Sequence, residues 1–314
     1  MAPGSLHDLL LEETASWRRE LHWDFSSSAA LVRQFADEQT LGGFALVAGG
    51  EVLGYAYTVA EKEKGLIGDL FVREPYRTVE RENSLLAACV DSLARMRGIR
   101  RIEAQILLLA APRPMPAAYH DQLQSYERQF LQCALRPWPG WPSGVARCRL
   151  DFDTWRPRYH DEAARLLADS YAGHIDSHIN DQYQSIGGAR RFLTYIVDYP
   201  GCGTFDEEAS LLAWNRDTGR LAGMCLASRV APETGHITQV CVSPALRDQG
   251  IGFALMVDSM RAMSAAACTH CSLTVTSANR KAIRLYERMG FVNKRTFAAM
   301  VWDGIRPARR GFFS

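Results

Sequence analysis

One short sequence pattern occurs twice in this chain of 314 residues. The first copy reads Phe71-Val-Arg-Glu-Pro-Tyr-Arg77 and the second reads Cys241-Val-Ser-Pro-Ala-Leu-Arg247. The valine and the final arginine recur at one constant spacing, and a helical pattern follows each copy. Further along, Tyr126-Glu-Arg128 matches Tyr286-Glu-Arg288. A repeat of this length predicts that the chain folds as two copies of one domain.

The order of apolar segments predicts α/β organisation in both copies. Helical spacing over residues 5–20 and 26–39 precedes strand-like segments, and a similar order returns in the second half of the chain. Between the halves, the cluster Arg136-Pro-Trp-Pro-Gly-Trp-Pro142 can continue neither a helix nor a strand, because proline lacks the amide hydrogen that both need. We therefore expect one domain over residues 1–140 and another over residues 141–314.

The second copy of the pattern runs through a glycine turn into an apolar helix. The turn is Asp248-Gln-Gly-Ile-Gly252, and the helix is expected from Phe253 to Ala267. Glycine carries no side chain to obstruct a ligand, and the first amides of a helix have no carbonyl partner within it. The helix dipole favours an anion at this end, which Arg247 can also reach. The turn therefore predicts a site for a pyrophosphate.

Two other phosphate-binding motifs do not fit these residues. The dinucleotide-binding fingerprint needs a third glycine where this chain has Leu255, and the Walker loop needs Gly-Lys followed by Ser or Thr. A plain strand-to-helix turn is the common role of an isolated glycine pair, and it remains open on these residues alone.

What does fit is Arg-x-x-Gly-x-Gly after a strand ending in Val-Cys-Val-Ser-Pro, which resembles the coenzyme A loop of the GNAT acyltransferase superfamily. The family pattern continues with a strand over Leu273–Thr276 and a helix over Asn279–Phe291 that glycine closes. The tandem arrangement is similar to that of the enzyme that makes mycothiol. The resemblance covers nearly the whole chain and implies two α/β (α+β) domains, each with a mixed, mostly antiparallel central sheet flanked by helices.

The resemblance also implies how the second half holds acetyl-CoA. The main chain of the strand would pair with the pantetheine arm, and the amides of the glycine turn would bind the pyrophosphate. Asn279 and Tyr286 occupy the places of an asparagine and a tyrosine that lie beside the coenzyme in the family. The residues expected to contact acetyl-CoA are Val240, Cys241, Val242, Arg247, Asp248, Gln249, Gly250, Ile251, Gly252, Phe253, Asn279 and Tyr286.

Acetyl transfer to an amine needs a proton acceptor for the ammonium form and a proton donor for the leaving thiolate. By the family match Tyr286 is the candidate donor, and a packed core aromatic is the alternative. His236 is the candidate acceptor, because relatives carry a glutamate or a histidine at this position and an imidazole titrates near neutral pH. Strand alternation would place Thr238 and Val240 on the same face of the strand as His236. A buried strand histidine without a role is the alternative.

The first copy of the turn differs from the second in its charge. Glu80 and Glu82 stand at the positions of Gly250 and Gly252. Carboxylates there would repel a pyrophosphate while remaining favourable at a helix N-terminus. We therefore expect the first domain to be degenerate and not to bind acetyl-CoA, and the second domain to be catalytic.

The segment Tyr171–Gln184 is rich in His, Asp and Asn, and in the family this region selects the acceptor. Such residues also serve as helix caps and solvent-facing loop residues. His174 and His178 are spaced to share one helical face, but no third ligand is evident, so we expect no metal site. Cys268 and Cys271 form a lone Cys-x-x-Cys pair, which we interpret as buried thiols in a reducing compartment.

The composition excludes some partners. The chain carries 36 basic and 35 acidic side chains, an excess too small to indicate nucleic acid. It has no secretory signal pattern and no membrane-spanning run of about eighteen apolar residues. We expect a cytoplasmic protein without a membrane partner, and the sequence leaves monomer and homodimer open.

Taken as a whole, the sequence predicts an N-acetyltransferase that moves the acetyl group of acetyl-CoA to a primary amine of a small molecule. Direct attack in a ternary complex is the expected mechanism. The rival hypothesis is a non-catalytic acetyl-CoA-binding protein with a regulatory or interaction role. The two hypotheses differ in whether loss of the Tyr286 hydroxyl affects the role of the protein.

Overall fold

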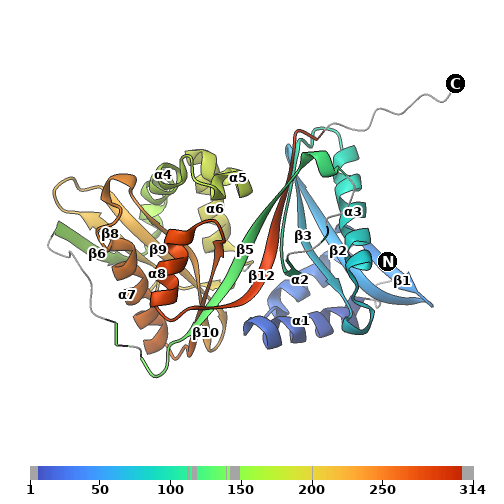
Figure 1. The fold of residues 1–314 in the computed structure, drawn as a ribbon, viewed down its shortest axis with the longest axis horizontal. Coiled ribbons are helices and arrows are strands. Elements are labelled where there is room, and N and C mark those ends of the chain that lie inside the picture. The colour runs from blue at the N-terminus through green and yellow to red at the C-terminus, as the bar shows by residue number, and fades with distance from the viewer. Residues whose placement is uncertain are drawn as a thin grey trace. The chain divides into compact units, whose positions relative to one another are not determined.

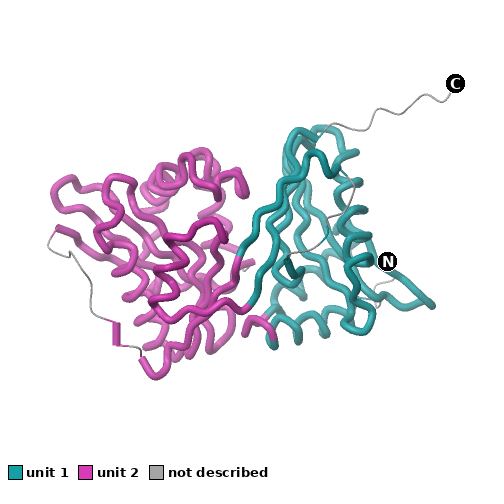
Figure 2. The backbone as a smooth tube through the Cα atoms, viewed as in Figure 1, with its two compact units in different colours: residues 1–19, 25–128, 295–314 teal, residues 20–24, 129–294 magenta. Residues whose placement is uncertain are grey.

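The computed structural model describes residues 6–111, 114, 119–138, 140–141, 149–199 and 201–305. These residues form two compact units, each with its own helices and sheet (Figure 1, Figure 2). Unit 1 contains the described residues within 1–19, 25–128 and 295–314, and unit 2 contains those within 20–24 and 129–294. The α/β organisation predicted for both halves is confirmed.

Unit 1 consists of three helices and a mixed sheet. Its elements are α1 (His7–Leu21), α2 (Ser26–Asp37), β1 (Gly42–Ala48), β2 (Glu51–Glu61), β3 (Lys64–Val72), α3 (Val79–Arg95) and β4 (Arg101–Ala110). The strand order is β1-β2-β3-β4-β12, and only β3 and β4 run parallel among the pairs that include β1 to β4. The apolar stripe of α3, with Leu86, Val90 and Leu93, packs on this sheet.

Unit 2 repeats this plan with additional elements. The elements of unit 2 are β6 (Leu150–Thr154), α4 (His160–Tyr171), α5 (Asp176–Ile179), α6 (Ile186–Asp198), β7 (Thr204–Phe205), β8 (Leu211–Asn215), β9 (Leu221–Ala231), β10 (Thr234–Val242), α7 (Ile251–Ala265), β11 (His270–Thr276) and α8 (Arg280–Arg288). The strand order is β5-β11-β10-β9-β8-β6, with β7 beside β9. One apolar cluster lies between the sheet and α7 and α8, and a second lies under α4 and α6. Among the described residues, no helix has the length and apolarity that crossing a membrane requires.

Two strands pass from one unit into the other (Figure 2). β5 (Leu123–Ala134) begins in unit 1 and contributes residues 129–134 to unit 2, where it lies beside β11. β12 (Val292–Asp303) begins in unit 2 and contributes residues 295–303 to unit 1, where it pairs antiparallel with β4. The sheet of each unit therefore includes the final strand of the other copy of the sequence repeat.

This exchange differs from the expected division between residues 140 and 141. That division followed the order of the chain and assigned the last strand to the second domain. The alternation of a strand specifies which face it buries, but not which sheet edge it joins. The expected linker at residues 136–142 lies partly outside the described residues.

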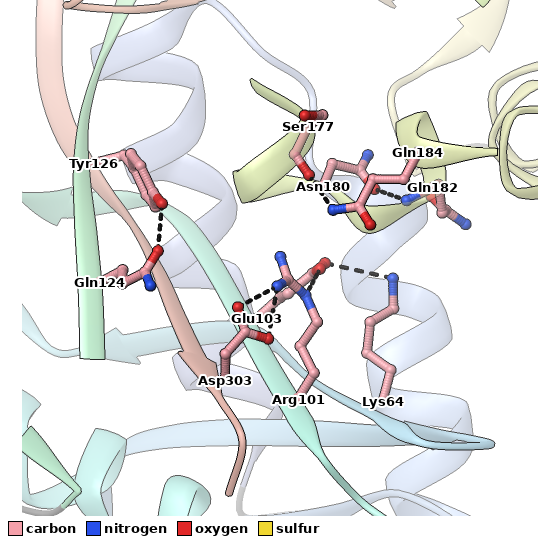
Figure 3. Close-up of polar contacts among 10 residues, drawn as sticks. All are labelled: Lys64, Arg101, Glu103, Gln124, Tyr126, Ser177, Asn180, Gln182, Gln184 and Asp303. Atoms are coloured by element: carbon pink, nitrogen blue, oxygen red, sulfur yellow. Dashed lines mark hydrogen bonds and ion pairs between the residues drawn. The ribbon is translucent and has the colours of Figure 1, made fainter. Parts of the chain in front are cut away.

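A group of ion pairs fixes β12 in unit 1 (Figure 3). Asp303 lies opposite Arg101 in the register of β12 and β4, and its two carboxylate oxygens accept hydrogen bonds from Nη1 of Arg101 at 2.7 and 2.8 Å. Arg101 also donates from Nε to Glu103 at 2.6 Å, and Lys64 lies 3.4 Å from the second Glu103 oxygen. Only 13% of the Arg101 side chain is exposed, so water screens these pairs weakly.

The internal repeat is visible in the two sheets. β1, β2, β3, α3 and β4 of unit 1 correspond in order to β8, β9, β10, α7 and β11 of unit 2. One expected match is wrong: Tyr126 lies on strand β5, whereas Tyr286 lies on helix α8. The three letters Tyr-Glu-Arg carry no periodicity of their own, so the flanking residues decide which element they join.

A pair of carboxyl groups is buried in unit 1. Neither Glu13 on α1 nor Asp69 on β3 forms an ion pair with a Lys or Arg in the described part of the chain. The Tyr55 hydroxyl donates to Glu13 at 2.7 Å, and the Leu70 amide donates to Asp69 at 2.7 Å. Burial raises the pKa of Asp69 to about 6. Burial, together with the negative charge of Asp69, raises the pKa of Glu13 well above its ordinary value.

We expect Asp69→Asn to stabilise the protein at neutral and alkaline pH. Because the folded-state pKa values are raised, the folded protein binds protons more tightly than the unfolded chain. The free energy of unfolding therefore falls as the pH rises from about 4 through about 6. Asparagine still accepts from the Leu70 amide but carries no charge, so the variant should avoid about 3 kcal/mol of this loss.

Urea unfolding at about pH 5 and about pH 8 measures the difference, with Asp121→Asn as the matched control because Asp121 is exposed in the same unit. The control should keep the wild-type pH dependence. An Asp69→Asn protein with that same pH dependence would show that the buried pair does not titrate as argued.

Candidate active site

The two parallel strands of unit 2 separate soon after they meet. β10 and β11 pair only over Thr234–Ile237 and His270–Leu273, although both strands continue beyond these residues. On its other edge β10 stays paired with β9 as far as Val242. Beyond Ile237, the edge of β10 that faces away from β9 has no strand partner among the described residues. An extended ligand arm that contains amide groups can pair with such an edge.

The turn between β10 and α7 presents main-chain amides to solvent. Gly250 is the N-cap of α7 and has a φ of 77°, which glycine adopts without steric cost. No described side chain caps this helix, and the Ala254 amide is bonded back to Gly250. The amides of residues 251–253 therefore remain available at the positive end of the helix dipole. This arrangement favours an anion.

Arg247, Asp248 and Gln249 are exposed in this turn. The Arg247 guanidinium donates from Nη2 to the carbonyl oxygen of Ser170 at 2.6 Å. Asp248 forms an ion pair with Lys281 of α8, which ties the turn to that helix. The positive charge of Arg247 thus lies at the turn without a carboxylate partner among the described residues.

The corresponding turn of unit 1 is closed by its own side chains. Thr78 caps α3 by accepting from the amide of Arg81 at 3.3 Å. Glu82 is buried and accepts from Nε of Arg77 at 2.9 Å. Glu80 is exposed, and hydrogen bonds at the helix N-terminus lower its pKa. An internal carboxylate therefore neutralises the arginine at the position where unit 2 has Gly252.

His236 lies on the part of β10 that is paired with β11, and it is buried. Its ring centroid lies 5.0 Å from that of Trp23 and 6.1 Å from that of Phe130. Its Nδ1 is 2.9 Å from Oγ of Ser272, the residue opposite it on β11. The buried imidazole thus packs against two aromatic rings.

The prediction that His236 and Val240 lie on the same face of the strand is wrong. A register shift between Ile237 and Gln239 interrupts the alternation of β10. Ile237 and Val240 consequently pack with the same apolar cluster, the one under α7 and α8. Since neighbouring strand residues point to opposite faces, His236 faces away from that cluster and from Val240. An irregularity of this kind adds a residue, and the period of two cannot anticipate it.

Helix α8 carries the other two predicted site residues. Asn279 is its N-cap, and the side-chain oxygen accepts from the Ala282 amide at 3.2 Å. Tyr286 is buried, and no described residue forms a hydrogen bond with its hydroxyl. Burial raises the pKa of Tyr286 above its ordinary value, with smaller contributions from Cys225 and Asp176. The hydroxyl therefore stays protonated at neutral pH and can serve as a proton donor.

A cluster of polar residues lies beside Asn279, and no sequence motif predicted it. The Thr276 hydroxyl, at the end of β11, donates to the carboxylate of Asp176 on α5. The Asp176 amide donates to Nδ1 of His174 at 3.2 Å, and Nε2 of His174 lies 3.5 Å from Nδ2 of Asn279. These residues connect the segment after α4 to the separated end of β11 and to α8. The polar composition of Tyr171–Gln184 was the available signal, but it could not single out Asp176.

Other polar residues of that segment hold its own backbone (Figure 3). The Gln184 side chain donates to the Ser177 carbonyl at 2.7 Å, and the Asn180 side chain accepts from the Gln182 amide at 3.1 Å. Asn180 and Gln184 therefore have the alternative role considered for this segment, that of helix caps and turn contacts.

The sequence contains two pairs of metal-type ligands, His174 with His178 and Cys268 with Cys271. His174 precedes α5 while His178 lies within it, so the two do not share a helix face, because the helix is shorter than their spacing suggested. No group of His, Cys, Asp and Glu that could hold a metal ion occurs in the described part of the chain. Cys268 and Cys271 are buried free thiols, and burial raises the pKa of both.

The exposed side of α8 borders an open hollow of about 500 Å³. Three of its lining residues are basic and one is acidic: Lys281, Arg284, Arg288 and Glu287. Lys281 is the residue paired with Asp248 of the anion-binding turn. The hollow therefore adjoins that turn and carries an excess of positive charge.

Comparison with known proteins agrees with this geometry. The sequence model of the acetyltransferase (GNAT) family matches residues 115–291. A mycothiol acetyltransferase from Acidimicrobium ferrooxidans is 32% identical over 102 residues, which cover 31% of this chain and 32% of that protein. The match thus spans about a third of the relative.

Two solved structures share the fold. A GCN5-related N-acetyltransferase from Sphaerobacter thermophilus has a TM-score of 0.67 at 17% identity, covering 98% of this chain and 95% of that chain. A tandem GNAT protein from the clavulanic acid biosynthesis pathway has a TM-score of 0.56 at 14% identity, covering 84% and 83%. At these identities the likeness is one of fold alone.

Proposed function

The chain belongs to the acetyltransferase (GNAT) family, and from this premise we propose that unit 2 transfers the acetyl group of acetyl-CoA to a primary amine of a small molecule. One observation carries the proposal. The unpaired edge of β10 leads directly into the uncapped N-terminus of α7, so one extended ligand can pair with the strand and place its pyrophosphate on the helix amides.

In this arrangement the pantetheine arm lies along Val240–Val242, and the pyrophosphate lies on the amides of Gln249–Phe253. Arg247 can turn from the Ser170 carbonyl to a phosphate oxygen, because the side chain is exposed. Asn279, which caps α8 at the other side of the separated strands, would contact the arm.

The proposed chemistry is direct attack in a ternary complex. The neutral amine attacks the thioester carbonyl carbon, the main-chain amide near Val240 polarises the carbonyl oxygen, and Tyr286 protonates the leaving sulfur. Cys225 is opposite Val240 in the sheet and also contributes to the raised pKa of Tyr286, which supports placing the tyrosine near this part of β10. The buried setting of His236 makes it a less accessible proton acceptor than the sequence suggested.

The relative from Acidimicrobium ferrooxidans is named a mycothiol acetyltransferase, which supports a small molecule as the acceptor. Glu80, Glu82 and the closed turn of unit 1 support a single coenzyme site per chain, in unit 2. The expected cytoplasmic location remains a prediction.

The first experiment is calorimetric titration with acetyl-CoA, followed by mass-spectrometric detection of acetylated product from a panel of primary amines. We expect one acetyl-CoA per chain and turnover of at least one amine. Absence of acetyl-CoA binding would overturn the proposal.

The hollow beside α8 gives a prediction about the coenzyme. We expect the wild type to bind CoA about 3- to 10-fold more tightly than dephospho-CoA, because exposed cations contribute modestly to binding a phosphate. Replacing both Arg284 and Arg288 by glutamine should remove this preference, whereas Arg191→Gln, an exposed arginine of α6, should keep it. Titrations with the two coenzymes decide the matter, and a preference that survives the double substitution would place the phosphate elsewhere.

A further inference from the structure

We propose that Asp176 binds the ammonium form of the acceptor amine and takes its proton, with Thr276 and His174 as positioning residues. This inference rests on the proposed acetyl transfer. It identifies the acceptor as an amine that arrives as a cation.

The position of Asp176 is the first reason. It is the first residue of α5, and Thr276, which donates to its carboxylate, is the last residue of β11. Thr276 lies beyond Leu273, where the pairing of β10 and β11 stops. The carboxylate is therefore held at the open end of the separated strands, where the thioester of a bound coenzyme is expected.

The second reason is the charge environment around the carboxylate. Its negative charge is one of the causes of the raised pKa of Tyr171 on α4 and of Tyr286 on α8, in both cases after burial. The carboxylate thus lies within electrostatic reach of the proposed proton donor. A proton acceptor and a proton donor then lie at the same end of the strands, as the reaction needs.

The third reason is that the carboxylate has no Lys or Arg partner among the described residues. Only 16% of the Asp176 side chain is exposed, and no Lys or Arg of the described residues forms an ion pair with it. A carboxylate that is removed from water without a counter-charge is costly. An ammonium group of the ligand would supply the missing charge.

His174 holds the start of α5 through the main chain of Asp176. Its Nδ1 lies 3.8 Å from the Asp176 carboxylate but accepts the Asp176 amide at 3.2 Å. The ring therefore orients the start of α5, and with it the Asp176 carboxylate.

The proposed step balances as follows. The ammonium group gives one proton to the Asp176 carboxylate, and the nitrogen lone pair attacks the thioester carbonyl carbon. A carbon–nitrogen bond forms, the carbon–sulfur bond breaks, and the sulfur takes the proton of the Tyr286 hydroxyl. The nitrogen loses its second proton, which returns to Tyr286 through solvent, and Asp176 releases its proton to water. The products are the amide, CoA thiol and one proton.

The test compares Asp176→Asn with the wild type and with Asp169→Asn, an exposed aspartate of α4. The probes are acetyl-CoA and three primary amines: tyramine, cadaverine and glucosamine. We expect Asp176→Asn to lower kcat/KM for the amines by about 10²- to 10⁴-fold. Its acetyl-CoA dissociation constant should stay within about threefold of wild type, and its thermal midpoint should be unchanged or raised because an unpaired charge is removed. Asp169→Asn should behave as wild type.

Two outcomes overturn the inference. Wild-type turnover in Asp176→Asn shows that the proton leaves elsewhere, and a lowered thermal midpoint with weakened acetyl-CoA binding shows that the carboxylate is structural. A wild type that binds acetyl-CoA but acetylates no amine instead removes the proposed function, and this is seen before any variant is compared.

Thr276→Val tests the positioning role separately. Valine has a similar shape but cannot donate to the carboxylate, so the acidic limb of the profile of kcat/KM against pH should move to higher pH. The titratable groups that the structure places around Asp176 are His174, Tyr171 and Tyr286. An unmoved acidic limb would show that the titrating base is not Asp176.

Discussion

Gly252→Glu is expected to abolish acetyl-CoA binding while unit 2 remains folded. A glutamate here would place its carboxylate at the N-terminus of α7 and beside Arg247, as Glu82 lies beside Arg77 in unit 1. It would occupy the amides that the pyrophosphate needs and repel the phosphates. We expect the dissociation constant to rise by at least about 100-fold, which corresponds to about 3 kcal/mol.

The backbone at Gly252 should tolerate the substitution. A Cβ atom at this position would meet only Cγ2 of Val242, at an ordinary contact distance of 3.5 Å. Gly250 differs, because its φ of 77° is costly for other residues. Gly252 is therefore the position at which charge can be tested without imposing backbone strain.

Calorimetric titration with acetyl-CoA measures the effect, and Gly252→Ala is the matched control because it adds a Cβ without charge. The alanine variant should bind within about fivefold of wild type, a change of about 1 kcal/mol. Both variants should keep the wild-type thermal midpoint. Saturable binding of acetyl-CoA to Gly252→Glu at wild-type affinity would locate the coenzyme away from this turn, and unit 1 would have to be reconsidered.

The anion-binding turn could be predicted from sequence because its chemistry is local. Arg247, Gly250 and Gly252 lie within six residues, and a helix N-terminus presents its amides whatever the rest of the fold does. The presence of Glu80 and Glu82 at the corresponding positions of unit 1 is an equally local feature. The tandem organisation followed from a repeat that could be read directly along the chain.

Features that depend on distant residues could not be predicted. The exchange of β5 and β12 depends on which sheet edge each strand joins. Both strands contain a continuous run of buried residues, which does not specify an edge. The irregularity between Ile237 and Gln239 reversed the face assigned to Val240 relative to His236. A single added residue changes the face of every residue beyond it, and no turn signal marks it within an apolar strand.

Asp176 shows the same limit within the site. It is one of several polar residues in Tyr171–Gln184, and others such as Asn180 and Gln184 bond to the main chain of the segment itself. What distinguishes Asp176 is its contact with Thr276, which lies 100 residues away in sequence. Composition can identify a polar segment, but only the fold identifies the member that faces the separated strands.

Tyr286→Phe is expected to slow acetyl transfer without weakening coenzyme binding. The substitution removes only the hydroxyl, and the ring keeps its contact with Phe291, whose centroid lies 6.0 Å away. Without the donor, the sulfur must leave as a thiolate or take a proton from water. General acid catalysis of this kind contributes about 10²- to 10⁴-fold, so kcat should fall by about that factor. The acetyl-CoA dissociation constant should change by less than about twofold.

The pH profile gives a second readout for this variant. Because the pKa of Tyr286 is raised in the folded protein, its hydroxyl remains protonated throughout the neutral range. Loss of the hydroxyl should therefore lower kcat by the same factor from about pH 6 to about pH 9 and leave both limbs in place. A basic limb that disappears in Tyr286→Phe would instead assign that limb to the tyrosine and contradict a raised pKa.

Tyr199→Phe is the matched control, because Tyr199 is exposed in the same unit and the change is the same. It should retain wild-type kcat, acetyl-CoA affinity and thermal midpoint. If Tyr286→Phe also retains wild-type kcat, the sulfur receives its proton from another group and the family match at this tyrosine reflects packing alone. If the wild type binds one acetyl-CoA but neither protein turns over any amine, the hydroxyl has no reaction to support. The non-catalytic coenzyme-binding hypothesis then accounts for the same turn, the same helix N-terminus and the same affinity loss in Gly252→Glu.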